Sequence, residues 1–472
     1  MNTINLNTIF PIRHKKFQKN EIFDIAIIGA GVVGCAIFKE FCEQGAKAVL
    51  IEKENDILEG ASKGNSALLH TGFDAPAESL ELACVQKGYD EFLKLKDELN
   101  LQILHTKAMV VAWNEEQLEK LDGILKKGLG NGVQELEQIA SSKVLSMEPN
   151  LSKNAQGAII VHGEAVIDAW SAPLAYVKKG ISCGGKTAFS HEVTNGKHNG
   201  AYWELDTKQN PIRAKVVINA AGLYGDIVEK ISGNIDFKII PRKGQFLIFD
   251  ETAYDLINSI ILPVPTKRTK GVVITKTAFG NLLVGPTAED QDNRIDSITT
   301  KETLEDLKQK AYTMLPALEE HEVTAIFAGL RPASDETYYR VKFNDEKNWI
   351  TVGGIRSTGL TSALGLAKHV YELNDTKYNS PKASKKISIP NISQFSSRDH
   401  QVAGYGRIVC HCEMVTDREI REACVGDTPA GTMSGLKRRT RAMMGRCQGF
   451  NCMASVASIC ESEVKKSCTK MI

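Results

Sequence analysis

The sequence has almost no net charge and no long apolar run, and each absence excludes a class of protein. Its 58 basic and 57 acidic side chains give a net charge of +1, which provides no general attraction to nucleic acid or to an anionic membrane. No apolar stretch is long enough to cross a bilayer. We therefore expect no nucleic-acid partner and no transmembrane segment, so that any membrane contact is peripheral or made through a partner.

The chain also lacks the features of a secreted protein. No signal-peptide pattern is apparent, and its eleven cysteines are odd in number, with seven of them from Cys410 onward. A secreted disulfide framework would follow a signal peptide and spread over a small domain. The cysteine usage therefore indicates a reducing compartment, the cytoplasm, and a local metal site.

The segment at positions 1–20 contains basic side chains and no acid. An organellar presequence would share this charge, but it would also be amphipathic and rich in Arg and Ser. A disordered lead-in is therefore the favoured interpretation, and a targeting peptide is the alternative.

Strand and helix patterns organise the rest of the chain. Residues 23–53 show an apolar strand, a glycine turn, a helix and a second apolar strand, and the order strand, glycine, helix recurs in 214–226 and 349–370. Residues 237–250 and 271–287 alternate between apolar and polar side chains, which predicts antiparallel strands of a second layer. A chain of 472 residues is expected to form two or three domains.

The predicted fold class is α/β, with a Rossmann-like nucleotide-binding domain, an α+β antiparallel-sheet substrate domain and a small C-terminal metal module. The predicted boundaries are residues 22–375 for the first two, interleaved, with the substrate part roughly at 80–165 and 237–330; residues 376–406 for a linker; and residues 407–472 for the module.

The stretch "IIGAGVVGCAI" places Gly29, Gly31 and Gly34 in a G-x-G-x-x-G pattern directly after an apolar strand. The first glycine permits a tight turn, the second lets the backbone approach a pyrophosphate, and the third lets the helix pack closely. Glu52, at the end of the next apolar strand, is placed to bind ribose hydroxyls. The pattern predicts a dinucleotide site and disfavours NADP, but it leaves NAD and FAD open.

Four further blocks carry a resemblance. They are "GASKGNSALLHTGFD" (60–74), "INAAGLYGD" (218–226), "AGLRPASD" (328–335) and "GGIRSTGLTSALGLA" (353–367). In this order they resemble the D-amino-acid oxidase and glycerol-3-phosphate dehydrogenase group of FAD-dependent oxidoreductases. The resemblance implies FAD as the cofactor and oxidation of a C–H bond beside an OH or NH₂ group. With the glycine pattern it predicts these FAD contacts: Gly29, Gly31, Gly34, Glu52, Lys53, Asn65, Ser66, Ala221, Gly222, Gly354, Gly359, Leu360 and Thr361.

Two residues are predicted to act on the substrate. Arg331 matches the arginine that holds the substrate's anionic group in this family, and a planar guanidinium suits a carboxylate or a phosphate; a structural salt bridge is the alternative. His70 would accept the hydroxyl proton, because a histidine titrates near neutrality, and a histidine that only packs against the flavin is an equal alternative. Lys243 is interpreted as a solvated lysine, with a second anion contact as the alternative.

The C-terminal segment carries the metal ligands. Cys410 and Cys412 are separated by one residue, and Cys447 and Cys452 by four. Four soft thiolates suit an iron–sulfur cluster or zinc, and a C-x-C pair is unusual in zinc fingers. The stretch "IVCHCEMVTDREIREAC…GLKRRTRAMMGRCQGFNC" closely resembles the [2Fe–2S] domain related to bacterioferritin-associated ferredoxin, in the version fused to anaerobic glycerol-3-phosphate dehydrogenases.

The other residues of this segment are assigned lesser roles. His411, Cys424, Cys460 and Cys468 are not expected to bind the metal. The basic run "KRRTR" (437–441) is interpreted as a solvated helix face, with acceptor docking as the alternative.

These patterns together predict an enzyme with two cofactors, FAD and a [2Fe–2S] cluster. The expected reaction is oxidation of sn-glycerol 3-phosphate to dihydroxyacetone phosphate, with electrons passed through the cluster to an acceptor protein or a quinone-linked subunit. L-2-hydroxyglutarate or another 2-hydroxy acid, and an amine or amino acid, are alternative substrates. An electron-transfer or iron-sensing subunit without its own substrate is the non-enzymatic alternative.

Overall fold

The structure is a computed structural model that describes residues 9–11, 17–18, 21–233, 237–265, 271–378, 387 and 389–469, with side chains described as far as residue 466. Most of the predicted lead-in, and the side chain of Cys468, lie outside the described residues. Within the lead-in, Ile9 and Phe10 are buried in the core of the C-terminal module. This differs from the expected disordered segment, because the two apolar side chains pack against a core that the sequence pattern does not reveal.

The first sheet contains β1, the strand that precedes the glycine pattern. Its eight strands follow the order β10-β11-β12-β1-β2-β9, with β20 beside β12 and β19 beside β20. Neighbouring strands among β9, β2, β1, β12 and β20 are parallel, and β10, β11 and β19 pair in antiparallel fashion. The strands are β1 (Ile22–Ile28), β2 (Ala48–Ile51), β9 (Lys186–Ala188), β10 (Val193–His198), β11 (Trp203–Thr207), β12 (Ile212–Asn219), β19 (Arg340–Asn344) and β20 (Trp349–Gly353).

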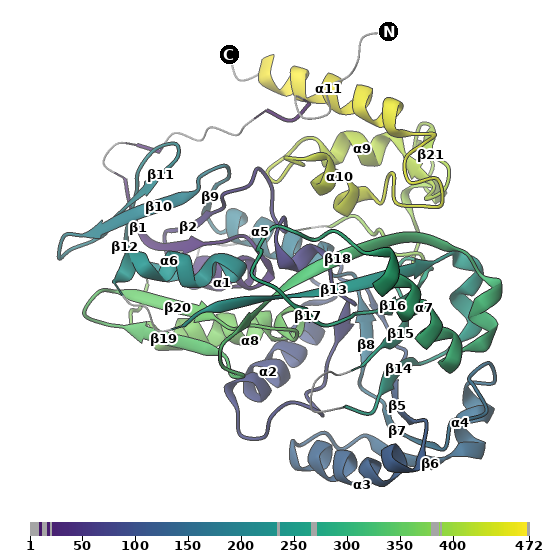
Figure 1. Cartoon of the computed structure of the whole chain (residues 1–472). Coiled ribbons are helices and arrows are strands. Elements are labelled where there is room, and N and C mark those ends of the chain that lie inside the picture. Colours follow the sequence, from purple (N-terminus) through teal and green to yellow (C-terminus); the bar gives the residue numbers. More distant parts are fainter. Residues whose placement is uncertain are drawn as a thin grey trace.

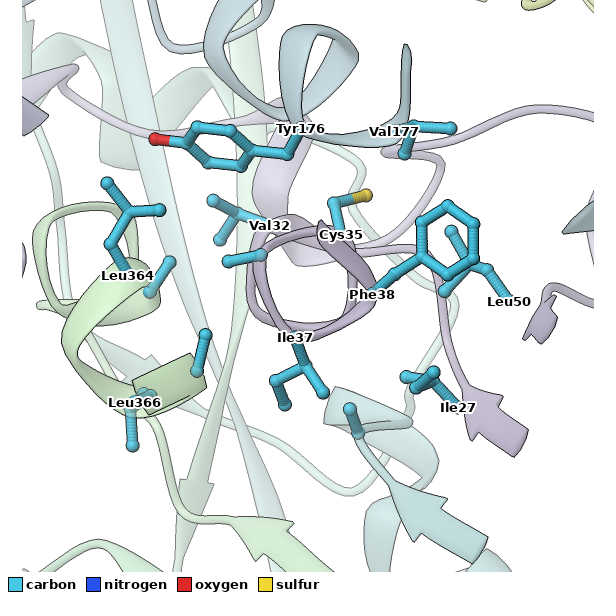
Figure 2. Close-up of a cluster of buried hydrophobic side chains, with 14 of the residues drawn as sticks. Ile27, Val32, Cys35, Ile37, Phe38, Leu50, Tyr176, Val177, Leu364 and Leu366 are labelled. Atoms are coloured by element: carbon cyan, nitrogen blue, oxygen red, sulfur yellow. The ribbon is translucent and has the colours of Figure 1, made fainter. Parts of the chain in front are cut away.

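Both faces of this sheet are covered. Ile25 and Ile27 of β1 point into one apolar cluster, whereas Ala26 and Ile28 point into another, as expected for a strand whose side chains alternate between two buried faces. Figure 2 shows the first cluster around α1, with Phe38 next to Leu50 of β2 on one side of the helix and side chains of α8 on the other. The helices of this layer are α1 (Val32–Glu43), α2 (Leu80–Leu95), α5 (Ser171–Ser182), α6 (Gly225–Ser232) and α8 (Gly359–Leu373).

Helices α2 and α8 approach each other closely at two glycines. A Cβ atom on Gly88 would lie 2.1 Å from the Thr361 carbonyl oxygen, and one on Gly365 would lie 2.2 Å from the Cys84 carbonyl oxygen. A larger residue at either position would therefore push α2 and α8 apart.

The second sheet is mostly antiparallel. Its nine strands follow the order β17-β13-β16-β15-β14-β5-β7-β6, with β18 paired along β13. Helices α3 (Glu115–Gly130), α4 (Ser141–Met147) and α7 (Lys301–Met314) accompany it. The strands are β5 (Ala108–Ala112), β6 (Leu136–Ala140), β7 (Gly157–Val161), β13 (Ile239–Phe249), β14 (Ile260–Pro263), β15 (Val273–Lys276), β16 (Leu282–Gly285), β17 (Glu289–Asp290) and β18 (Val323–Ser334).

Short elements join the two layers. A three-stranded sheet contains β3 (Leu68–Leu69), β8 (Ala165–Ile167) and β4 (Ile103–Leu104). The 3₁₀ helices are η2 (Ala61–Lys63), η3 (Gly222–Tyr224), η4 (Glu251–Leu256), η5 (Pro316–Glu320) and η6 (Asp399–Gln401). The predicted α/β class, with a second, antiparallel layer, is confirmed.

The C-terminal module has its own small core and lies as a yellow layer over the rest of the chain in Figure 1. The described residues before it pack on the larger part, since Asn100 donates to the Ile389 carbonyl oxygen at 2.8 Å. Its elements are β21 (Ile408–Cys410), β22 (Val415–Thr416), α9 (Asp417–Ala423), α10 (Met433–Thr440) and α11 (Met453–Thr469).

None of the helices in the described part of the chain combines the length and the apolar character needed to cross a bilayer.

Candidate active site and iron–sulfur centre

A cavity of about 540 Å³ lies between the two sheets. Its walls come from the turn after β1, the η2 loop, the end of β12, the strands β13 and β18, and the loop between β20 and α8. The predicted FAD contacts all line it except Gly34 and Thr361, and Arg331 lines it as well. The fold therefore brings residues from distant parts of the chain around one elongated space.

The glycine turn forms one end of the cavity. Gly29 has a φ of +106°, and a Cβ there would lie 2.5 Å from the Ala220 carbonyl oxygen. Gly34 does not line the cavity; a Cβ on it would lie 1.9 Å from the Gly29 carbonyl oxygen. Gly31 precedes α1, whose first N–H, that of Val32, donates to Ser62 Oγ at 3.0 Å. This end can receive a pyrophosphate at a helix N-terminus.

Glu52 is held by the same turn. Its carboxylate accepts from the Ala30 N–H at 2.7 Å and from the Glu54 N–H at 3.0 Å. Burial raises the pKa of Glu52 to about 7, because a carboxylate removed from water is less stable in its charged form. Ribose hydroxyls that donate to this carboxylate would offset that cost. Lys53 beside it lies 4.0 Å from the centre of the Tyr224 ring.

The η2 loop and the loop before α8 form the middle of the cavity. Asn65 uses its amide within its own loop, donating to the Ser62 carbonyl oxygen and accepting from the Ala67 N–H. A Cβ on Gly329 would lie 2.3 Å from the Gly64 carbonyl oxygen, so the loop presses directly on β18. Gly354, with a φ of +68°, turns the opposite wall. Both loops therefore contribute backbone to the lining of the cavity.

Arg331 extends from β18 into the cavity wall. Its Nη2 donates to the Thr287 carbonyl oxygen at 2.7 Å, and its Nε to the Arg242 carbonyl oxygen at 3.4 Å. No carboxylate of the described residues lies within salt-bridge distance of it; Asp290 pairs with Arg242 instead. Burial and the nearby Arg242 lower the pKa of Arg331 to about 10. The structure thus holds a cation whose hydrogen-bond partners are backbone carbonyls.

The interpretation of Lys243 as a solvated lysine is wrong. The residue is only 8% exposed, and its ammonium donates to the Ile298 carbonyl oxygen at 3.3 Å. It lies on β13 between β17 and β18, in a sheet position that the alternating sequence pattern alone does not distinguish from an exposed one.

His70 is not one of the residues that line the cavity, and its side chain is 20% exposed. Its N–H donates to Thr361 Oγ1 at 3.0 Å, and the Thr361 hydroxyl donates to the Leu68 carbonyl oxygen. Its Nδ1 lies 2.8 Å from the carboxylate of Glu164, whose side chain is fully buried. Sequence reasoning missed Glu164; the available signal was a single acid between two apolar runs, in "GAIIVHGEAVI".

The four predicted ligand cysteines meet in the module as two pairs. The Cys412 thiol lies within hydrogen-bonding distance of Cys447, and the Cys452 thiol within that of Cys410. Cys410 and Cys452 are buried, whereas Cys412 and Cys447 are partly exposed. Within the described residues, no three Cys, His, Asp or Glu side chains meet as a site for a single metal ion.

This thiol arrangement fits a two-iron cluster, in which two thiolates bind each iron. The backbone N–H of Asn451 lowers the pKa of Cys447, while burial and the neighbouring Cys410 raise the pKa of Cys452 to about 12. Thiols this close resist ionisation together unless a metal offsets their charge. Cys424 instead shares a hydrogen bond with Cys460 inside the module core.

Two arginines of α10 join the module to the loop that follows β2. Arg439 makes two hydrogen bonds to Asp56, at 2.7 and 2.8 Å, and Arg438 donates to Glu59 at 2.8 Å. Both pairs are almost completely buried, and Glu59 also lines the cavity. The interpretation of "KRRTR" as a solvated face is therefore wrong for these two arginines, because the carboxylates that cover them come from the opposite end of the sequence.

Comparison with known proteins agrees with this geometry. Residues 24–373 match the family of FAD dependent oxidoreductases, and residues 408–462 match the BFD-like [2Fe-2S] binding domain. The chain belongs to the FAD-dependent oxidoreductase family and carries a C-terminal iron–sulfur domain.

Among its relatives is the glycerol 3-phosphate dehydrogenase of Caloramator mitchellensis, 33% identical over 95% of this chain and 96% of that protein. The glycerol 3-phosphate oxidase of Mycoplasma pneumoniae is 28% identical over 79% of this chain and its own full length. The reduced, FAD-bound structure of L-alpha-glycerophosphate oxidase from Mycoplasma pneumoniae covers 79% of this chain with a TM-score of 0.74 and 25% identity. The predictions of an FAD enzyme and a [2Fe–2S] domain are thus confirmed.

Proposed function

We propose that this chain is a dehydrogenase that oxidises sn-glycerol 3-phosphate to dihydroxyacetone phosphate and passes the electrons through its cluster to a separate acceptor. The observation that carries the proposal is Arg331, a guanidinium in the cavity wall without a carboxylate partner among the described residues. An anion placed in the cavity would supply the missing charge and bind bidentately. The names of the relatives favour a phosphate ester as that anion.

Each residue of the site has a separate role in the proposed reaction. Arg331 binds the phosphate and orients the carbinol carbon, and His70 accepts the proton of the hydroxyl group. The glycine turn, Glu52 and the loop before α8 would hold FAD, which when bound would accept the hydride from that carbon. The alcohol thereby loses one proton and one hydride, and the products are a ketone, a protonated histidine and two electrons on the cofactor.

The C-terminal module supports a dehydrogenase rather than an oxidase. The relative named as an oxidase matches 79% of this chain along its full length, whereas the relative named as a dehydrogenase matches 95%, which extends into the module. A one-electron cluster is useful when the final acceptor is a protein or a quinone-linked subunit. We propose such an acceptor for this chain.

A 2-hydroxy acid is the second candidate substrate. The L-2-hydroxyglutarate dehydrogenase of Indibacter alkaliphilus is 28% identical over 56% of this chain, and a guanidinium binds carboxylate and phosphate alike. Steady-state assays with a dye acceptor should compare glycerol 3-phosphate, L-2-hydroxyglutarate and a secondary amine. We expect the highest kcat/KM for glycerol 3-phosphate; turnover of L-2-hydroxyglutarate alone would reject the proposed substrate.

Arg331→Met tests the observation that carries the proposal. Removing one member of a desolvated charge pair costs about 2–5 kcal/mol, so KM for glycerol 3-phosphate should rise by at least about 30-fold while FAD stays bound. Arg213→Met, which removes an arginine paired with Glu204 on the sheet surface, is the control. An unchanged KM in Arg331→Met would place the phosphate elsewhere.

A further inference from the structure

Glu164 is a buried carboxylate that the proposed reaction does not use. It lies in the turn between β7 and β8, and its side chain has no solvent exposure. Its Oε1 accepts from the Thr71 N–H at 2.7 Å and from the Thr71 hydroxyl at 2.9 Å, while its Oε2 faces His70 Nδ1 at 2.8 Å. A buried carboxylate requires compensating donors, and these three supply them.

The turn that carries Glu164 is held in place by a hydrogen bond and by a close contact. The Tyr89 hydroxyl of α2 donates to the Gly163 carbonyl oxygen at 2.8 Å. A Cβ on Gly163 would lie 2.7 Å from Thr71 Cγ2, so the turn and the His70–Thr71 segment are in direct contact. Tyr89 is a further titratable group near Glu164; burial and then the Glu164 charge raise its pKa, so its phenol is neutral near pH 7.

The His70 backbone is held from the opposite side. Its N–H donates to the Thr361 hydroxyl in the first turn of α8, next to Leu360 in the cavity wall. The imidazole is therefore fixed at two points, by α8 through the backbone and by Glu164 through Nδ1. A side chain restrained in this way keeps a single orientation relative to the cavity wall.

This arrangement has a chemical consequence. An imidazole that donates its Nδ1–H to a carboxylate carries its lone pair on Nε2, because a neutral ring has one proton. The carboxylate also stabilises the imidazolium that forms when Nε2 takes up a proton. A neutral side chain of the same shape would supply the hydrogen bond without the charge.

We propose that Glu164 is the positioning residue of the proton acceptor: it holds His70 in the Nδ1–H form, so that Nε2 receives the substrate hydroxyl proton. This inference rests on the proposed function of His70. In the step, the substrate O–H bond breaks, an Nε2–H bond forms, and the positive charge on the ring is balanced by Glu164. Bound FAD would accept the hydride from the carbinol carbon, so protons and electrons balance.

The first test needs no turnover. Nitrogen-15 chemical shifts of histidine-labelled protein, with the His70 signals identified by their loss in His70→Gln, report which ring nitrogen carries the proton. We expect the proton on Nδ1 in the wild-type protein at a pH where the ring is neutral. A proton on Nε2 would overturn the proposal.

The second test uses Glu164→Gln. Loss of the partner that orients a metal-bound histidine typically costs about 10- to 100-fold. We expect a fall of similar size in kcat with glycerol 3-phosphate, with KM nearly unchanged. The acid limb of the kcat/KM profile should move to lower pH, because the imidazolium loses its stabilising charge. Glu164→Asp should recover part of both effects, which a purely structural role does not predict.

Glu137→Gln is the matched control. Glu137 lies 4.0 Å from His162 on the neighbouring strand β6, in an exposed carboxylate–histidine pair, and this variant should match wild type in every measurement. Unchanged kcat and pH profile in a folded, FAD-loaded Glu164→Gln protein would overturn the proposal.

The two proposals fail in different ways. If glycerol 3-phosphate is not the substrate, wild-type protein does not turn it over, yet the nitrogen-15 shifts still report the tautomer of His70. If Glu164 has no positioning role, the wild-type protein turns over glycerol 3-phosphate, but either the His70 proton lies on Nε2 or Glu164→Gln leaves kcat and the pH profile unchanged.

Discussion

The flavoprotein part and the iron–sulfur module are stabilised by different means. The larger part buries apolar side chains on both faces of a parallel sheet and along a second sheet. The module, which begins at Arg407, has one small core and places several arginines in buried ion pairs, including Arg438, Arg439 and Arg441. A domain of this size gains little from its core alone. We therefore expect the stability of the module to depend on its metal and on its contact with the larger part.

The ion pairs between the module and the larger part differ in how deeply the arginine is buried. Arg439 and Asp56 are buried, whereas the side chain of Arg446, which pairs with Asp250, is 73% exposed. Arg446 lowers the pKa of Asp250 to about 2. Asp250 itself is buried, but it also accepts from the Thr252 N–H, so it keeps a partner when the solvated arginine is removed, and the pair should contribute little to stability. Breaking a buried pair is costly, because the remaining charge has no partner.

Cys447→Ser should have the largest effect, because it should disable the module and leave flavin reduction in the larger part intact. Replacing a thiolate ligand removes the cluster, so the iron–sulfur absorbance should be lost and turnover with a one-electron acceptor should fall by about 100-fold or more. Reduction of FAD by substrate should survive, because the larger part has its own core. Cys424→Ser, which alters a core cysteine outside the two ligand pairs, should retain the cluster. Absorbance spectra and anaerobic flavin reduction check both variants.

Asp56→Asn should have the next largest effect. It leaves Arg439 buried without its carboxylate, which costs about 3–5 kcal/mol, so the module should unfold at a lower urea concentration as followed by the cluster absorbance. Because the same loop lines the cavity through Glu54 and Glu59, FAD should also bind more weakly. Arg446→Met is the control and should leave the unfolding midpoint almost unchanged. Equal midpoints in the two variants would contradict the distinction between the pairs.

The smallest predicted effect concerns Glu52 and pH. Its folded pKa of about 7 exceeds the ordinary value of 4.5, so the folded apoprotein holds an extra proton between these values and loses stability as pH rises through that window. Ribose hydroxyls favour the ionised form, so FAD binding should strengthen from pH 6 to pH 8 by up to about tenfold. Flavin fluorescence titrations measure this change, and Glu52→Gln should abolish it. A wild-type affinity independent of pH would count against the role of Glu52.

The sequence predicted best the features that depend on local backbone requirements or on ligand spacing. Gly29 and Gly34 fill positions where a Cβ would collide with backbone, and the four cysteines are recognisable by type and spacing. The sequence predicted poorly the features created by tertiary contact. Nothing near Arg439 in the chain indicates that Asp56 will cover it.

The same limit applies to the substrate site. Lys243 follows an alternating pattern that does not specify which neighbours will enclose it. The buried Glu164 becomes meaningful only when the turn after β7 is placed against His70. Both cases concern polar side chains, whose environment is set by partners far away in sequence.

The most direct test of the proposed electron path is an anaerobic absorbance spectrum of the purified protein before and after addition of glycerol 3-phosphate. We predict that the flavin band bleaches and that the iron–sulfur absorbance changes with it, which requires substrate oxidation and electron transfer between the two parts of the chain. A flavin that stays oxidised in the presence of an intact cluster would contradict the proposed substrate.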